Sequence, residues 1–189
     1  MGEIKIMNII NHFKTITNHK LLVMKYCFKV GLYKQGLLHD LSKYSFVEFS
    51  AGIKYYRGYV SPNSIQKTVE GYSAAWLHHK GRNKHHFEYW IDYGINEEDC
   101  LIGMKMPVKY VVEMFIDRVC ASKNYLKEKY NDKSPFEYYE KRKHYYILHN
   151  EVRELLEILL NKLAYEGENT TFAYIKFILS HSDVGNTKY

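Results

Sequence analysis

The sequence predicts an all-α fold. The chain has three prolines in 189 residues, and its apolar residues recur mainly at intervals of three and four, the spacing that gives a helix one buried face. No segment alternates apolar and polar residues as a half-buried strand does. Hydrophobic residues make up 46% and charged residues 25% of the chain, which is the composition of a globular protein with a sizeable core. We therefore expect helices almost throughout the chain.

The expected helices can be followed along the chain. The first 30 residues form one long helix or two shorter ones that end near Gly31, and another helix runs from Val108 to about Lys129. The segments YYRGYVSPNS and DYGINEED combine glycine or proline with polar residues, and they are expected to be loops on either side of a histidine-rich stretch.

The C-terminal third carries signals for helix starts and ends. The segment SPFEYYEKRKHYYIL begins with Ser134 as its expected N-cap, and NEVRELLEILLNKLA begins with Asn150 as its expected N-cap. Gly167 follows the end of the second segment, and FAYIKFILS is expected to form a short final helix. No linker or repeat divides the chain, so we expect a single domain over 1–189, with a core at about 12–130 and C-terminal helices at about 135–180 packed on it.

Charge and cysteine usage limit the partners. The formal net charge of +6 favours an anionic partner such as a nucleotide, a nucleic acid or a phosphorylated metabolite. The three cysteines match neither a disulfide framework nor a CxxC zinc motif, which favours a reducing cytoplasm. The sequence shows no export signal and no apolar run of roughly 18 residues, so we expect a cytoplasmic protein with no membrane partner.

The segment GLLHDLSKYS contains a candidate metal-binding pair, His39 and Asp40. Imidazole and carboxylate groups suit divalent metals, and a carboxylate can bridge two ions roughly 3.5 to 4 Å apart. Upstream, His12 and His19 are two helical turns apart and share a face. We prefer His19 as a ligand because it is closer to the His39–Asp40 pair, whereas His12 can equally be a surface residue.

Two acidic residues, Glu113 and Asp117, are four positions apart on the predicted 108–129 helix, so they share a face. Asp117 is the candidate ligand, and Glu113 is placed to hold a ligating histidine in orientation. The structural alternative is an acidic edge that pairs with Arg118 or Lys109.

The segment WLHHKGRNKHH holds two histidine pairs seven residues apart. Adjacent residues of a helix point about 100° apart, and residues seven apart lie roughly 10.5 Å apart along it, so four ligands to one metal are excluded. One histidine from each pair can reach a common site if the chain leaves the helix between them, at Gly81 to Asn83. We expect His79 and His86 to be the ligands, although the assignment within each pair stays open. The alternative is a basic surface strip.

The order of these residues resembles the H…HD…H…H…D signature of the HD-domain metal-dependent phosphohydrolase superfamily. The segment LLHDLSK is similar to the HD-I-G-K type segment of that superfamily, with Ser42 in place of the glycine. The segments AWLHHKGRNKHHFEYW and VVEMFIDRVCASKNY are more similar still to an uncharacterised group of small bacterial and phage HD-like proteins. This similarity runs from about His19 to the final helix.

The resemblance implies an HD-type helical bundle with one or two divalent metal ions at its centre. The ions would be manganese, iron, magnesium, cobalt or zinc. The first metal site it implies consists of His19, His39, Asp40 and Asp117. Asp40 would bridge to a second metal, held by one histidine from each downstream pair.

The activity implied by the resemblance is hydrolysis of a nucleotide-type phosphomonoester or phosphodiester through a metal-activated water. The residues expected to serve catalysis are Asp40, Lys43 and Glu113. The residues expected to contact the substrate are Lys43, His78, Arg82 and His85. Two alternatives remain: a di-iron oxygenase on the same scaffold, and a non-catalytic protein that holds a structural zinc or binds nucleic acid through a basic surface.

Overall fold

The structure is a computed structural model that describes residues 2–96 and 100–182. It is all-α, with 73% helix and 2% strand. The α-helices are α1 (Gly2–Lys29), α2 (Tyr33–Leu38), α3 (Phe46–Lys54), α4 (Pro62–Glu70), α5 (Ala74–Lys80), α6 (Val108–Leu126), α7 (Ser134–Glu140) and α8 (Asn150–Ser182). Short 3₁₀ helices are η1 (Leu41–Tyr44), η2 (Phe87–Trp90), η3 (Lys127–Lys129) and η4 (Lys143–Tyr145), and the strands are β1 (Ile91–Asp92) and β2 (Ile102–Gly103). Within the described ranges, no helix is both long and apolar enough to cross a membrane.

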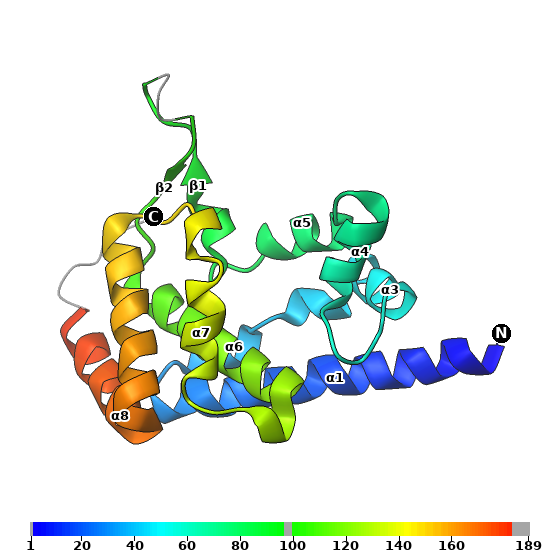
Figure 1. The fold of residues 1–189 in the computed structure, drawn as a ribbon, viewed down its shortest axis with the longest axis horizontal. Coiled ribbons are helices and arrows are strands. Elements are labelled where there is room, and N and C mark those ends of the chain that lie inside the picture. The colour runs from blue at the N-terminus through cyan, green and yellow to red at the C-terminus, as the bar shows by residue number, and fades with distance from the viewer. Residues whose placement is uncertain (1, 97–99, 183–189) are drawn as a thin grey trace.

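The long helix α1 forms the base of the molecule in Figure 1, with α6 packed against it. Helices α7 and α8 lie toward one end of α1, and α3, α4 and α5 gather over its N-terminal half (Figure 1). The α1–α6 pair therefore lies between a C-terminal helical layer and a smaller group of short helices.

The hydrophobic core lies where α1, α6, α7 and α8 meet. Val23 of α1, Phe115 of α6, and Leu156, Leu159 and Ile175 of α8 are fully buried there. Burial of each such side chain contributes about 1.5 to 3 kcal/mol, which fixes α6 against its neighbours. The residues of α6 that face the short helices are consequently held on a rigid support.

The two longest predicted helices are confirmed. The first segment forms one helix through Lys29, followed by Gly31 with a φ of 83°. The helix predicted from Val108 to about Lys129 is observed as α6, which continues directly into η3. The three cysteines are free, as expected.

The Ser134 cap prediction is wrong by one position. The N-cap of α7 is Lys133, and the Ser134 hydroxyl instead accepts a hydrogen bond from the backbone N–H of Asn131 at 3.1 Å. The helix ends at Glu140, well before the end of the predicted segment. The side chain of Ser134 therefore stabilises the turn before the helix rather than its first turn.

Helix α8 begins at Asn150, but His149 takes the N-cap position expected for Asn150. The His149 carbonyl accepts hydrogen bonds from the N–H groups of Val152 and Arg153, both at 3.0 Å. The predicted end at Gly167 is confirmed, because its φ of 81° and ψ of 173° interrupt the helix there. A residue with a side chain rarely adopts such a φ, which explains why a glycine occupies the kink.

The expectation of no strand is wrong at one place. Strands β1 and β2 pair antiparallel, with Ile91 opposite Gly103, and form the narrow hairpin that projects from the body in Figure 1. Two residues per strand are too few to produce an alternating pattern, so the sequence carries no signal for them. The predicted loop DYGINEED connects these strands, and its residues 97–99 lie outside the described ranges. The other predicted loop, YYRGYVSPNS, becomes helix α4 at Pro62.

Candidate metal centre

His39 and Asp40 directly follow helix α2 and are buried in the interior. Gly36 lies so close to α1 that a Cβ there would come within 3.0 Å of the Cys27 Cβ and 3.2 Å of the Met24 Cα. The helix ends at Leu38, and Asp40 then adopts a left-handed conformation with a φ of 54° and ψ of 23°. This conformation is uncommon for a residue with a side chain and persists only where surrounding contacts stabilise it.

The carboxylate of Asp40 lies at the centre of a buried histidine cluster. Its Oδ1 is 3.2 Å from Nε2 of His79 and 3.4 Å from Nε2 of His85. Its Oδ2 is 3.3 Å from Nε2 of His39 and 3.8 Å from Nε2 of His19. The two oxygens of one carboxylate thus face two different groups of histidines.

The first group comprises His19, His39, Asp40 and Asp117, which each offer one ligand atom within 4.8 Å of the others. Nε2 of His19 lies 2.9 Å from Oδ1 of Asp117, and Nε2 of His39 lies 3.5 Å from the same oxygen. Helices α1 and α6 each supply one of these residues, and the segment after α2 supplies the other two. The four residues expected in the first metal site are therefore brought together.

The second group comprises Asp40, His79, His85 and His86, again with one ligand atom each within 4.8 Å. The sequence predicts one histidine from each pair, but both His85 and His86 lie here, with ring centroids 4.2 Å apart. The restriction on adjacent residues holds only in a helix, and α5 ends at Lys80. His85, expected to contact the substrate, instead points into the cluster with a side chain that is 2% exposed.

The chain leaves the helix between the two histidine pairs, as expected, but for a different physical reason. Gly81 has a φ of −73°, which any residue can adopt. The Asn83 side chain stabilises the break instead, because its Nδ2 donates to the His79 carbonyl and to the Ser42 hydroxyl, both at 2.8 Å. Asn83 thereby ties the second histidine segment to the segment after Asp40.

Two carboxylates hold the outer nitrogens of these histidines. Oε1 of Glu113 lies 2.9 Å from Nδ1 of His39 and 3.1 Å from Nδ1 of His85. Oε2 of Glu48 lies 2.8 Å from Nδ1 of His79. With Nδ1 carrying the proton, each histidine donates to a carboxylate and directs the Nε2 lone pair toward Asp40. This is the arrangement that orients histidine ligands in metal sites.

Glu48 also contacts the cluster, although nothing in the sequence indicates this contact. It occupies the third position of α3, where its backbone N–H donates to the hydroxyl of Ser45, the N-cap. This capping pattern is readable in the sequence, but it indicates a helix start and not a contact with a histidine. The other oxygen of Glu48, Oε1, lies 2.7 Å from Nδ1 of His78, so His78 contacts the support of the cluster.

The electrostatic balance keeps the carboxylates of the cluster ionised. Burial alone would raise the pKa of Asp40, but His39, Lys43 and His79 hold it well below its usual range. Burial likewise opposes ionisation of Asp117. The interactions of Asp117 with His19 and His39 outweigh this effect and lower the pKa of Asp117. Asp40 and Asp117 therefore remain negatively charged although they lie in the interior.

Several buried atoms of the cluster have no hydrogen-bond partner among the described residues. They include Nε2 of His39, His85 and His86, and Oδ1 of Asp40. A buried polar atom without a partner costs about 1 to 3 kcal/mol, so native proteins rarely leave several together unpaired. Imidazole nitrogens and carboxylate oxygens are also the donors that divalent transition metals take. The cluster could therefore hold a metal ion.

Lys43, Arg82 and His12 lie at different distances from the ligand groups. Nζ of Lys43 lies 2.6 Å from Oδ2 of Asp40, at the edge of the cluster. Arg82 is exposed at the end of α5 and donates to the His78 carbonyl at 3.3 Å, so its described contacts do not reach the ligand groups. His12 packs beside the ring of Tyr56, outside both groups, and burial followed by the charge of Lys43 lowers its pKa to about 4.

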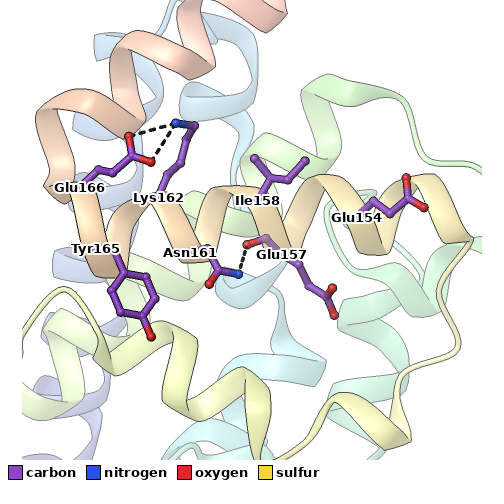
Figure 2. A pocket seen from close by; sticks show the side chains of 7 residues that line it. All are labelled: Glu154, Glu157, Ile158, Asn161, Lys162, Tyr165 and Glu166. Carbon is purple, nitrogen blue, oxygen red and sulfur yellow. Dashed lines mark hydrogen bonds and ion pairs between the residues drawn. The ribbon is translucent and has the colours of Figure 1, made fainter.

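A separate hollow on α8 is shown in Figure 2. It is lined by Glu154, Glu157, Ile158, Asn161, Lys162, Tyr165 and Glu166. Lys162 and Glu166 form an ion pair across one turn at 3.0 Å, and these residues come from α8 alone. The hollow contains none of the histidines of the cluster.

The fold and the cluster define an all-α protein with a buried histidine–carboxylate group that could hold a metal ion. The chain belongs to a family described as a family of unknown function, DUF5662, whose model matches residues 8–162. That range contains every residue of both ligand groups and both supporting glutamates. No curated protein and no solved structure matches the chain.

Proposed function

We propose that this protein is a metal-dependent phosphohydrolase of the HD type that acts on a nucleotide-type phosphomonoester or phosphodiester. The main support for the proposal is that the two oxygens of the Asp40 carboxylate face different histidines. Oδ1 faces His79 and Oδ2 faces His39. A carboxylate shared in this way suits a pair of neighbouring cations, which is a common arrangement in enzymes that hydrolyse phosphate esters.

The ligands in this proposal form two sets that share Asp40. One set is His19, His39, Asp40 and Asp117, and the other is Asp40, His79, His85 and His86. Two divalent ions bound there would supply Lewis acidity, which lowers the pKa of a bound water and offsets charge on the phosphoryl oxygens. The histidine nitrogens in both sets favour iron, cobalt or zinc over magnesium, and the carboxylates also suit manganese.

Two residues of the chain have separate tasks in this proposal. Glu113 accepts from Nδ1 of both His39 and His85, which fixes the direction of one ligand in each set. Lys43 pairs with Asp40, and its side chain is still 26% exposed, so it can also meet a substrate phosphate. Lys43 therefore contacts both a residue of the ligand groups and the solvent.

The test is metal analysis of the purified protein, followed by assays with nucleoside monophosphates and cyclic nucleotides in the presence of manganese, cobalt, iron or magnesium. We expect bound metal and metal-dependent release of phosphate or a nucleoside monophosphate. Lys43→Met should retain the metal and raise KM, whereas Lys34→Met, at an exposed lysine of α2, should change neither. Absence of both bound metal and activity with every ion would contradict the proposal.

A second candidate is a di-iron oxygenase, which the five histidines of the two sets favour because imidazole is a good iron ligand. The two functions are separable by measurement. Iron retained after aerobic purification, with an absorbance change on addition of dithionite, supports the oxygenase. A colourless manganese protein that hydrolyses phosphate esters excludes it.

A further inference from the structure

A hollow lies between α1 and the C-terminal end of α6, and we call it the α1–α6 hollow. Its volume is about 490 Å³, which is within the range of small-molecule sites. Both asparagine and lysine side chains line it, and no acidic residue does. The polar residues of its lining are Asn18, Lys25, Lys123, Asn124 and Lys127. Helix α1 supplies the first two of them, and the end of α6 with the following residue supplies the others.

Most of these polar side chains have free ends. Within the described ranges, no hydrogen bond or ion pair joins the side chains of Asn18, Lys25, Asn124 and Lys127 to other groups. Lys123 differs, because it donates to Glu168 at 2.7 Å and its charge is thereby offset. One exposed lysine without a partner would carry no information. Here two lysines and two amides from different helices line the same hollow.

The backbone at Lys127 is strained. Its φ is 51° and its ψ is −119°, directly after the end of α6. Apart from glycines, the described residues with a positive φ are Lys127 and Asp40, and Asp40 belongs to the metal centre. Glycine would adopt this conformation without strain, yet the chain has a lysine here. Strained residues concentrate at functional sites, which is consistent with a role for the Lys127 side chain.

The α1–α6 hollow is separate from the metal centre. It shares no residue with the two ligand groups. Asn124 is on the same face of α6 as Asp117, but it is two turns further along the helix, which corresponds to about 10.5 Å. A single phosphate group therefore cannot contact both residues.

We propose that the α1–α6 hollow is a second, metal-independent binding site, which takes the phosphate group of a small phosphate monoester. Lys25 and Lys127 neutralise the phosphate, and Asn18 and Asn124 donate hydrogen bonds to its oxygens. A phosphate monoester carries a charge of about −1.5 to −2 at pH 7, and the two uncompensated lysine charges match it. The inference does not depend on the hydrolase proposed above, because no metal takes part in the binding.

The position of the lysines on α6 has a simpler explanation that the experiment must separate. Lysines near the C-terminal end of a helix offset the negative end of its dipole, and this applies to Lys123 and Lys127. It does not apply to the neutral side chains of Asn18 and Asn124. A role at the helix end affects stability, whereas a binding site affects the affinity for phosphate.

The experiment titrates chelator-treated, full-length protein with methyl phosphate, inorganic phosphate or dimethyl phosphate at constant ionic strength. Nuclear magnetic resonance of the ¹⁵N-labelled protein follows the side-chain amide signals of Asn18 and Asn124. We expect methyl phosphate to shift these signals saturably. It should bind at least about 5-fold more tightly than dimethyl phosphate, which carries a single charge.

The matched variants test the two lysines. Lys25→Gln and Lys127→Gln should each weaken the binding of methyl phosphate by about 5-fold. The controls are Lys14→Gln and Lys129→Gln, at exposed lysines of α1 and η3 that do not line the hollow, and they should leave the affinity unchanged. Lys43→Met, at the metal centre, should also leave it unchanged.

Four outcomes would overturn the inference. The first is the absence of saturable shifts with methyl phosphate. The second is binding that is lost in Lys43→Met but kept in Lys25→Gln, which would assign the phosphate to the metal centre. The third is a Lys127→Gln protein that is less stable in urea but binds with wild-type affinity, which would leave only a role at the helix end. The fourth is binding of inorganic phosphate without binding of methyl phosphate, which would exclude an ester as the ligand. These measurements involve neither metal nor hydrolysis, so their failure leaves the proposed hydrolase untouched.

Discussion

Nε2 of His79 lies 3.2 Å from Oδ1 of Asp40, on the side of the carboxylate opposite the oxygen that faces His39. Asp40 follows α2, and His79 belongs to α5, so the contact joins two parts of the chain that are far apart in sequence. The sharing of Asp40 between the two ligand sets depends on this contact.

Glu113 should strengthen metal binding by both ligand sets. Glu113→Gln keeps the shape of the side chain but removes the charge that faces Nδ1 of His39 and His85. Loss of such a supporting carboxylate weakens metal binding about 10- to 100-fold. Calorimetric titration with manganese or zinc measures this change, and Glu154→Gln, on the exposed surface of α8, is the control. Unchanged affinity in Glu113→Gln would remove Glu113 from the site.

Glu48 should affect one ligand set only. Its carboxylate supports His79 and His78, and it has no described contact with the histidines of the first set. Glu48→Gln should therefore weaken binding of one metal ion while the other remains bound with wild-type affinity. Stoichiometry from elemental analysis after gel filtration checks this result. An equal loss of both ions would show that the two sets are not separately supported.

Gly36 should be required for the close packing of α2 on α1. Gly36→Ala introduces a Cβ 3.0 Å from the Cys27 Cβ and 3.2 Å from backbone atoms of Met24, which crowds a tight contact. We expect a loss of about 1 to 3 kcal/mol in the free energy of unfolding, measured in urea, and weaker metal binding because the next residues include His39.

The control for Gly36 is Gly81→Ala. Gly81 has an ordinary φ of −73°, and a Cβ there would meet its nearest described neighbour at 3.4 Å. The free energy of unfolding should change by less than about 0.5 kcal/mol. A large loss at Gly81 would mean that the break between the histidine pairs does depend on a glycine.

Glu168 should make stability depend on pH. It accepts from Lys123 at 2.7 Å, from Lys29 at 3.0 Å and from the Tyr26 hydroxyl at 2.9 Å. Burial opposes ionisation, but these partners outweigh it and lower the pKa of Glu168. A lowered pKa in the folded state gives stability that is present above the unfolded pKa of about 4.3 and is lost as the pH falls through the folded value.

The corresponding experiment uses Glu168→Gln in the metal-free protein. The variant should be less stable than wild type by about 1 kcal/mol at pH 7, and the difference should shrink as the pH falls below about 4. Urea unfolding at both pH values measures it. A difference that stays constant with pH would show that the charge of Glu168 does not contribute.

The sequence was sufficient to predict the parts of the fold that depend on local patterns. Apolar spacing predicts α6 from Val108, and the glycine at position 167 predicts the break in α8, because helix periodicity and glycine conformation are local properties. The two-residue strands escape prediction because they depend on pairing between Ile91 and Gly103, which the sequence does not encode as a pattern.

The sequence likewise predicts some residues of the metal centre and not others. The residue types mark His19, His39, Asp40 and Asp117 as candidates one by one, whereas the sequence predicts their grouping in one metal site only through the family resemblance. The roles of Glu48 and His85 depend on where α3 and the chain after α5 come to lie. Only the three-dimensional structure places Glu48 beside His79 and turns His85 toward Asp40.

The metal content of Asp40→Asn shows whether one carboxylate serves both ligand sets. The wild-type protein, loaded with manganese or zinc and freed of excess metal by gel filtration, should retain two ions per chain by elemental analysis. Asp40→Asn should lose both, because the shared carboxylate belongs to both sets, while Asp92→Asn on the exposed hairpin should keep both. If Asp40→Asn retains the full wild-type metal content, Asp40 is not shared between two metal ions.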